Sequence, residues 1–399
     1  MSDLECEVLV VGAGPAGSAA AAALARAGRD VLLIESHAHP RPKACAEYAS
    51  PRIAEELALL GMPDDAWRTD ALPLRGMRVI RGPDAVDMHY ADASGPRPAW
   101  GLDREKFDAT LAAHAVASGA RLLERTALEE VHWRGGVGGI GGQVMGASLR
   151  TANGRRTVRC RWLIGADGAR SRTSQRVARE RGMGRLRRLG LVAHYEGVPE
   201  LADHGEMHVA QDFYVGLAPL AGKRLNLGMA LPLDGERRPA EERFQAAIDG
   251  IPAVAERLRG RRRLTPIRGA SPIAHRVAGT AGHGWMLVGD AAGFIDPFTG
   301  EGIYRALRSA RAAAEALAAG DDEGAAQRYR VARREAFAAK DALTWLVQGM
   351  LAARPVMGYA LRRLAARPQL AARLGSALGD LRPASDALSP LFLARVLWP

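Results

Sequence analysis

The chain has few cysteines, few aromatic side chains and no long apolar run. Its 399 residues include three cysteines, and aromatic residues make up 5% of the chain. Three cysteines without a paired spacing give no disulfide framework and no zinc site, which predicts a cytoplasmic protein without a metal centre. The uncharged run Gly135 to Leu149 is glycine-rich and too short to span a membrane. Acidic residues follow Met1, so we expect no signal peptide.

Lysine is also scarce, although the chain is basic. There are 55 basic and 44 acidic residues, for a net charge of +11, and only four of the basic residues are lysines. The arginines are spread along the chain and aromatics are too few to interleave with them, so nucleic-acid binding is not expected. Attraction to an anionic lipid surface or to an acidic redox partner is the alternative that this charge favours.

What the sequence does contain begins with a strand, a glycine-rich turn and a helix. The apolar run 7–11 is typical of a buried parallel strand, and residues 18–27 are small and favour a helix. Between them lies Gly-Ala-Gly-Pro-Ala-Gly at 12–17, and a second strand at 30–34 ends at Glu35. This order predicts a dinucleotide-binding unit of the Rossmann type. The unit alone does not distinguish FAD from NAD.

Each part of this unit has a physical task. Gly12 permits the tight turn, Gly14 lets a diphosphate approach the backbone, and Gly17 lets helix and strand pack closely. The helix N-terminus presents unpaired N–H groups to the phosphates. Glu35 is placed to accept hydrogen bonds from an adenosine ribose.

Two more motifs follow apolar strands later in the chain. Trp162 to Ile164 leads into Gly-Ala-Asp-Gly at 165–168. Trp285 to Val288 leads into Gly-Asp-Ala-Ala-Gly at 289–293, and then into Asp-Pro-Phe-Thr-Gly-Glu-Gly at 296–302 before a long helix. Since the three motifs lie far apart, the cofactor domain must be discontinuous.

These motifs, in this order over residues 5 to 320, resemble the flavoprotein superfamily that includes p-hydroxybenzoate hydroxylase and geranylgeranyl reductase. The resemblance implies an FAD cofactor. It also implies that Asp290 binds the ribityl and phosphate end of the flavin, that Arg104 contacts the diphosphate, and that the 300–302 turn packs beside the isoalloxazine. The cofactor-binding residues expected from the first motif and the resemblance are Gly12, Gly14, Pro15, Ala16, Gly17, Glu35, Lys43, Arg104, Asp167, Gly289, Asp290, Pro297, Gly300, Glu301, Gly302 and Ile303.

Two of these residues have an ordinary structural alternative. Arg104 could be a surface arginine near a helix start. Asp167 could be a turn aspartate beside Gly168. There is no second GxGxxG unit, so electrons are expected from NAD(P)H visiting a shared groove, or from a separate ferredoxin or flavin reductase. Ser174 stands where the hydroxylase branch has an arginine, which weakens hydroxylase-type NADPH binding.

Several details resemble the geranylgeranyl reductase branch. Gly293 stands where hydroxylases commonly have histidine, and Lys43-Ala44-Cys45 is similar to the reductase loop near the flavin. The aromatic motif of the reductases, Tyr-x-Trp-x-Phe-Pro, corresponds here to residues 214–219, in which Gly216 and Ala218 replace Trp and Phe. This loss of volume is enough to change substrate preference. A bulkier or ring-shaped apolar substrate therefore fits as well as a prenyl chain.

The candidate catalytic residues are Cys45, Glu47, Tyr48 and Tyr214. Cys45 would lie over the flavin and position substrate or pass a proton, and its alternative is a small buried side chain. Glu47 and Tyr48 are candidate proton donors. Tyr214 is retained from the aromatic motif. The halogenase signature is absent, and no lysine lies between Lys43 and Lys106, which argues against a halogenase.

The motifs divide the chain into six segments of an α/β protein. A Rossmann-type FAD-binding domain and an antiparallel substrate sheet alternate, and a helical region closes the chain. The expected ranges are 1–73, 101–189 and 264–320 for the FAD-binding domain, 74–100 and 190–263 for the substrate domain, and 321–399 for the helical region. Arginines alternate with leucines in that last region. We expect its leucines to pack on the body, and the alternative is peripheral contact with an anionic membrane.

The sequence therefore predicts an FAD-dependent oxidoreductase that acts on a hydrophobic small molecule of isoprenoid or polyketide type. The leading reaction is reduction of a C=C bond by hydride from reduced flavin. One alternative is an FAD-dependent monooxygenase that hydroxylates an aromatic or polyketide substrate. The other is a non-catalytic flavin-binding protein. The shared scaffold does not separate these reactions.

Overall fold

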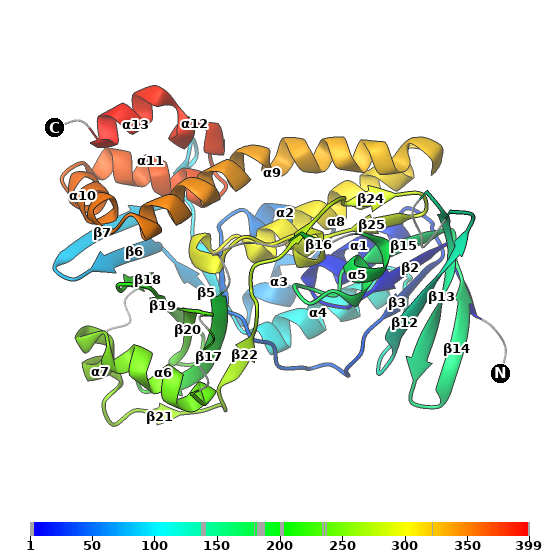
Figure 1. Ribbon diagram of the computed structural model, residues 1–399, viewed down its shortest axis with the longest axis horizontal. Coiled ribbons are helices and arrows are strands. Elements are labelled where there is room, and N and C mark those ends of the chain that lie inside the picture. Colours follow the sequence, from blue (N-terminus) through cyan, green and yellow to red (C-terminus); the bar gives the residue numbers. More distant parts are fainter. Residues whose placement is uncertain are drawn as a thin grey trace.

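A six-stranded sheet forms the centre of the computed structural model, which describes residues 4–136, 141–178, 180–181, 188–199, 203–233, 235, 238–320 and 322–397 (Figure 1). Its strand order is β11-β3-β2-β15-β25-β24, and all pairs are parallel except β24 with β25. The strands are β2 (Val8–Val11), β3 (Val31–Ile34), β11 (Arg121–Leu123), β15 (Trp162–Gly165), β24 (Ala281–Gly282) and β25 (Trp285–Leu287). The sheet joins three separate stretches of sequence, which confirms the discontinuous α/β fold.

The two faces of this sheet are covered differently because alternate strand residues point to opposite sides. Val8 and Val10 pack with the helices α1, α4 and α8, whereas Leu9 and Val11 pack with a four-stranded sheet of order β1-β14-β13-β12. Every residue of β2, β3 and β15 is buried, which explains their continuous apolar sequences. The covering elements are α1 (Pro15–Arg26), α4 (Arg104–Ala117), α8 (Gly302–Ala318), β1 (Leu4–Glu5), β12 (Ala127–Arg134), β13 (Gln143–Thr151) and β14 (Gly154–Arg159).

A large second sheet forms the other half of the molecule. Its order is β21-β17-β20-β19-β18-β6-β7, with β22 also paired to β17. The sheet was expected to be antiparallel, and it is so except where β18 runs parallel to β6, because a long connection separates these two strands. Its strands are β6 (Gly76–Arg81), β7 (Asp84–His89), β17 (Arg188–Glu196), β18 (His204–Val209), β19 (Tyr214–Leu220), β20 (Arg224–Pro232), β21 (Arg262–Arg263) and β22 (Arg268–Ala270).

Helices cover both faces of this second sheet. On one face, odd-numbered residues such as Leu225 and Leu227 pack with α6 (Ala240–Asp249) and α7 (Pro252–Leu258). On the other face, Met207 and Tyr214 join an apolar cluster with the C-terminal helices. These helices are α9 (Asp322–Ala352), α10 (Arg354–Ala365), α11 (Pro368–Leu378), α12 (Ala384–Leu388) and α13 (Pro390–Leu397). Helices α10 to α13 lie together at one end of the molecule, and α9 runs from there across the cofactor half, which confirms the helical C-terminal region (Figure 1).

Short elements connect the two halves. A three-stranded sheet of order β4-β10-β5 contacts α8 through β4 and β19 through β5 and β10, and so bridges the two halves. Among the described residues, no helix is both long and apolar enough to cross a membrane. The remaining elements are α2 (Ile53–Leu59), α3 (Asp64–Arg68), α5 (Arg172–Val177), β4 (Tyr48–Ala49), β5 (Ala71–Leu74), β8 (Ala91–Asp92), β9 (Gly95–Pro96), β10 (Ala99–Leu102), β16 (Glu180–Arg181), β23 (Arg276–Val277) and the 3₁₀ turns Gly289–Ala292 and Pro297–Thr299.

Candidate active site

The turn between β2 and α1 requires glycine at two of its positions. Gly12 has φ +99°, and a Cβ there would lie 2.7 Å from the Ala166 carbonyl oxygen. A Cβ on Gly17 would lie 1.7 Å from the Gly12 carbonyl oxygen. Gly14 differs, because a Cβ there would meet only the Arg41 guanidinium, at 3.5 Å, and the Asp108 carboxylate, at 4.0 Å. Gly12 and Gly17 are therefore needed for packing, whereas Gly14 keeps the helix start accessible.

The N-terminus of α1 offers free backbone donors beside Gly14. No side chain caps this helix, Pro15 occupies its first turn, and the first turn holds no acidic residue. The uncapped N–H groups and the helix dipole attract an anion.

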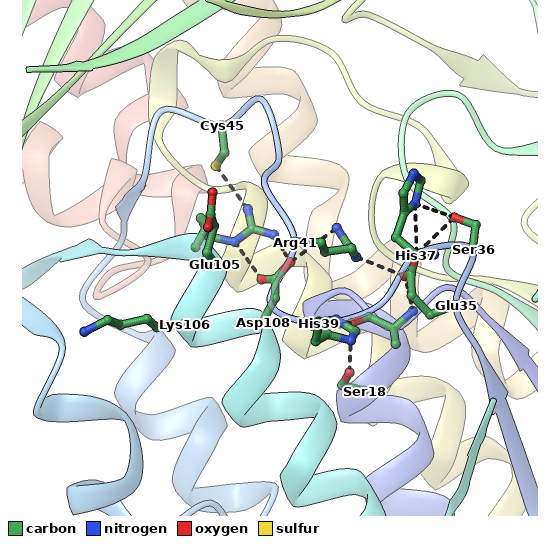
Figure 2. A network of polar contacts seen from close by, with 12 residues as sticks. Ser18, Glu35, Ser36, His37, His39, Arg41, Cys45, Glu105, Lys106 and Asp108 are labelled. Carbon is green, nitrogen blue, oxygen red and sulfur yellow. Dashed lines mark hydrogen bonds and ion pairs between the residues drawn. The ribbon is translucent and has the colours of Figure 1, made fainter. Parts of the chain in front are cut away.

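Glu35 directly follows β3 and lies beside this turn (Figure 2). Its carboxylate accepts the Ala13 N–H at 3.0 Å and the His37 N–H at 3.1 Å, and it pairs with Arg41 at 3.1 Å. Burial alone would raise the pKa of Glu35, but Arg41 and the two N–H donors together lower it below its usual value. The carboxylate is therefore ionised and held in a fixed position.

A row of alternating charges extends from Glu35 towards Cys45 (Figure 2). Arg41 lies 3.9 Å from the Asp108 carboxylate, which also binds the Arg104 guanidinium at 2.8 and 3.0 Å. Arg104 donates in turn to the Cys45 sulfur at 3.1 Å. Its side chain is 5% exposed, so the surface-arginine alternative is wrong. Burial opposes the charge on Arg104, but Asp108 and Cys45 hold its pKa above the ordinary value.

The loop from Cys45 to Glu47 meets the second sheet at a cluster of buried polar groups. Glu47 is 3% exposed and has φ +56°. Its carboxylate accepts the Arg104 backbone N–H at 2.9 Å, contacts His194 Nε2 at 2.6 Å and accepts the Asn226 amide at 2.8 Å. Asn226 also donates to the Cys45 carbonyl at 2.9 Å.

His194 and Asn226 are directly opposite each other on β17 and β20. The other ring nitrogen of His194 lies 3.2 Å from the Thr265 hydroxyl. The sheet therefore fixes the imidazole against Glu47 at the point where the Cys45 loop touches both halves of the molecule. A carboxylate paired with an imidazole can hold and move a proton.

Comparisons with known proteins identify the family. Residues 5–340 match the FAD binding domain family. The chain belongs to this family. Menaquinone reductase of Mycobacterium tuberculosis strain H37Rv is 34% identical over 79% of this chain and 77% of its own length. Digeranylgeranylglycerophospholipid reductase 1 of Methanopyrus kandleri is 32% identical over 78% of this chain and 80% of its own. The chain is accordingly an FAD-dependent oxidoreductase that resembles the geranylgeranyl reductases.

Solved structures agree with this fold. A flavoprotein/dehydrogenase from Cytophaga hutchinsonii has a TM-score of 0.82 at 21% identity, and covers 98% of this chain and 96% of its own. A geranylgeranyl bacteriochlorophyll reductase-like protein from Thermoplasma acidophilum has a TM-score of 0.76 at 23% identity, over 99% and 91%.

The residues around the glycine turn fit FAD in this family member. The uncapped α1 N-terminus and the accessible Gly14 suit a diphosphate, and Glu35 lies where an adenosine ribose would be bound. Arg41 Nε is buried and has no hydrogen-bond partner among the residues that the structure describes. Asp290 is partly exposed at the start of the Gly289–Ala292 turn, where its carboxylate can receive hydroxyl groups.

Three other expected cofactor residues have clear structural neighbours. Asp167 accepts hydrogen bonds from the Thr173 N–H and hydroxyl, at 3.0 and 3.1 Å, and from the Ser171 hydroxyl. Burial raises the pKa of Asp167 despite these donors. Asp167 therefore makes the contacts of an ordinary turn aspartate. Lys43 lies beside Gly168, since a Cβ there would be 3.7 Å from its ammonium. A Cβ on Gly289 would lie 2.8 Å from the Ala16 Cβ, so this glycine allows α1 to pack closely.

The turn before α8 is packed against tyrosine. Pro297 opens its 3₁₀ turn, and Gly300 has φ +70° with room for no Cβ, because Tyr48 Cδ1 would lie 2.8 Å away. The Tyr48 hydroxyl donates to Tyr90 at 2.9 Å rather than pointing at Cys45 or Glu47. Burial raises the pKa of Tyr48 well above its ordinary value. Tyr48 therefore supports the turn, and Gly302 and the buried Ile303 begin α8 beside it.

Tyr214 is separate from the Glu47 cluster. Its hydroxyl donates to Asp296 at 2.6 Å, and Arg188 pairs with the same carboxylate at 3.0 Å. Burial raises the pKa of Asp296 although Arg188 and Tyr214 oppose this. The Tyr214 ring packs edge-on against Phe298 at 5.2 Å. Tyr214 is thus anchored to the segment just before the 300–302 turn.

Between the Glu47 cluster and the Tyr214–Asp296 pair, two facing positions of the sheet are glycines. Gly216 and Gly228 are paired across β19 and β20. A Cβ on Gly216 would lie 3.5 Å from Met207 Cε, and one on Gly228 would lie 3.4 Å from Ala46 Cβ. This face of the sheet, flanked by Tyr214 and Asn226, therefore has the small residues that the sequence pattern indicated.

Sequence analysis missed His194, Asn226, Arg41 and Asp108. One signal was present in the chain: Asn226 is a lone amide in the otherwise apolar strand 225–231. Buried amides in strands must find partners, which marks such a residue for attention. The other three could be recognised only once the fold had brought the Cys45 loop, α4 and β17 together.

Proposed function

We propose that this enzyme reduces a C=C bond in the isoprenoid part of a lipid or quinone. The observation that carries the proposal is the buried Glu47–His194–Asn226 cluster around the Cys45 loop. Support comes from relatives named for reduction of menaquinone and of digeranylgeranylglycerophospholipid. An isolated alkene needs hydride at one carbon and a proton at the other, so a proton-holding pair beside an apolar surface suits this reaction.

Each group in the cluster has a task in this proposal. FAD, when bound and reduced, supplies the hydride. Glu47 and His194 hold a proton between Glu47 Oε2 and His194 Nε2 and deliver it at the Cys45 loop. Cys45 orients the substrate, because its sulfur is fixed by Arg104 and by the Glu47 N–H at 3.4 Å. The glycine-lined face of β19 and β20 accommodates the apolar chain.

The electrons are proposed to come from outside the chain. NAD(P)H visiting the flavin face is one source, and a separate ferredoxin or flavin reductase is the other. The described residues contain one glycine-rich dinucleotide turn, at 12–17, and this turn serves FAD. Chemical reduction of the bound flavin therefore allows the second half of the reaction to be tested without the natural donor.

A single-turnover experiment tests the proposed function. The purified protein is loaded with FAD, reduced anaerobically with one equivalent of dithionite, and mixed either with menaquinone in detergent or with oxygen. We expect menaquinone to reoxidise the flavin and to yield a product two hydrogens heavier in its prenyl chain. If the mass of menaquinone does not change and oxygen instead gives a long-lived adduct in the flavin spectrum, the protein is a monooxygenase. Flavin binding with neither reaction would establish a non-catalytic flavoprotein.

Contact with an anionic membrane is a further part of the proposal, since isoprenoid lipids reside there. Residues 354–397 hold seven arginines and no lysine against two aspartates. Leu391 and Leu397 on α13 are 62% and 46% exposed, and Val356 on α10 is 43% exposed. Exposed apolar side chains among arginines favour peripheral binding to anionic lipid.

The prediction is that this protein sediments with vesicles containing phosphatidylglycerol and not with neutral phosphatidylcholine vesicles. Replacing Leu391 and Leu397 by glutamate should reduce the bound fraction about tenfold, since each loses apolar burial and gains repulsion. Val116→Glu is the matched control, because Val116 is 47% exposed on α4 of the cofactor half. Equal loss in the control, or no binding by the unaltered chain, would refute the membrane surface.

A further inference from the structure

A buried ammonium joins the C-terminal helices to the flavin-side turn. Lys340 on α9 is 6% exposed and lies 3.0 Å from a Glu301 carboxylate oxygen and 2.7 Å from one of Asp380. It also donates to the carbonyl oxygens of Ala377 and Leu378, at 2.9 and 3.3 Å. These carbonyls end α11, where a cation is favourable. One side chain thus binds α9, the end of α11 and the turn at 300–302.

The single positive charge of Lys340 faces two carboxylates, those of Glu301 and Asp380. Glu301 and Asp380 are both about 3% exposed or less at the side chain, and the nearest additional cation, Arg305, lies 3.8 Å from Glu301. Burial raises the pKa of Glu301 to about 7, with Lys340 opposing and Asp380 adding to the rise. Loss of the ammonium would leave two buried carboxylates in contact with few cations, which is costly.

A second route links the same elements through aromatic packing. Gly379, just after α11, lies against Tyr90, since a Cβ there would be 2.7 Å from the ring. Tyr90 accepts the hydroxyl hydrogen bond of Tyr48, and the Tyr48 ring packs on Gly300. The ionic and the aromatic contacts therefore both end at the turn that precedes α8.

We propose that Lys340 is a positioning residue which, through Glu301, couples binding of the flavin ring at the 300–302 turn to docking of helices α10 and α11. The proposal rests on the proposed function, since it places the flavin ring at this turn. The coupled helices belong to the apolar cluster that includes Met207, Tyr214 and Phe298 on the substrate side. Docking them would complete one wall of the substrate site only when the cofactor is in place. By linkage, docked helices must in turn strengthen FAD binding.

Hydrogen exchange of residues 354–378 tests this coupling in the full-length chain. FAD should slow exchange in α10 and α11 by about tenfold or more, whereas ADP, which lacks the flavin ring, should not. Lys340→Met should remove this protection and raise the FAD Kd by about tenfold or more. In a Glu301→Gln background the same substitution should have no further effect on the Kd, because both variants break one link.

Matched variants separate this role from ordinary stabilisation. Tyr329→Phe removes a different buried hydrogen bond from α9, to the Leu287 carbonyl, and should keep the FAD-dependent protection. If Lys340→Met does not fold, Asp380→Asn, which keeps Lys340 and Glu301, should still weaken the protection. Equal protection by ADP, or full protection in Lys340→Met, overturns the coupling. Failure of the unaltered chain to bind FAD would overturn the proposed function itself.

Discussion

Glu47→Gln should slow reduction of menaquinone by the reduced, FAD-loaded enzyme about 10²- to 10⁴-fold. Glutamine preserves the size of the side chain and can still accept the Arg104 N–H, but it cannot share a proton with His194 as a carboxylate does. FAD affinity and the spectrum of the oxidised flavin should be unchanged. The measurement is anaerobic stopped-flow of flavin reoxidation in a single turnover.

The same sheet supplies the control for this prediction. Glu206 contacts His208 at 2.8 Å and Arg257 at 2.6 Å, and it projects from the face of β18 opposite to Met207. Glu206→Gln therefore disrupts a similar buried pair away from the Cys45 loop and should leave the reoxidation rate within about twofold. If both variants are equally slow, the Glu47 effect is one of folding and the proton-holding role is refuted.

Two glycines of one turn should respond to alanine in different ways. Gly14→Ala should fold normally and lose FAD affinity by about 100-fold or more, because its methyl group has ordinary contacts within the protein but projects where a diphosphate would approach the α1 N-terminus. Gly17→Ala should destabilise the fold by about 3 kcal/mol or more, because its Cβ would overlap the Gly12 carbonyl. Thermal unfolding without FAD and flavin fluorescence titration measure the two effects.

This pair also tests where the cofactor lies. Unchanged FAD affinity in Gly14→Ala would remove the diphosphate from this turn. A stable, fully folded Gly17→Ala chain would contradict the close approach of α1 to the loop after β2. The two outcomes are independent, because one depends on the ligand and the other on the backbone alone.

The elements that bear a strong local pattern could be predicted from the sequence. The strands expected at 7–11 and 30–34 are β2 and β3, shortened by one residue at the start, and the helix expected from Ile303 begins at Gly302. Continuous apolar runs next to glycine-rich turns specify buried parallel strands with little ambiguity. The C-terminal helices could be predicted because leucines alternate with arginines along this region.

The site could be predicted only in part. One hydrogen-bond network joins three of the expected site residues, Cys45, Glu47 and Arg104. Tyr48 instead binds Tyr90, and Tyr214 binds Asp296. The partners of Glu47 come from β17 and β20, nearly 150 and 180 residues away along the chain. Such pairings depend on sheet register rather than on local pattern, so spacing in the sequence gives no signal for them. Whether each residue acts on cofactor or substrate stays a prediction.

The Gly216–Gly228 pair has a consequence for how such an enzyme can evolve. Neither glycine has a positive φ, and a methyl group at either position would make only ordinary contacts, so the backbone does not demand glycine there. Alanine could therefore be introduced at either position while β19 and β20 keep their pairing, whereas a larger side chain would have to displace Met207 or Ala46. In the proposed function, the two glycine positions would bear on substrate choice rather than on the pairing of their strands. The proposed substrate face could thus change by one methyl group at a time without loss of the sheet that carries it.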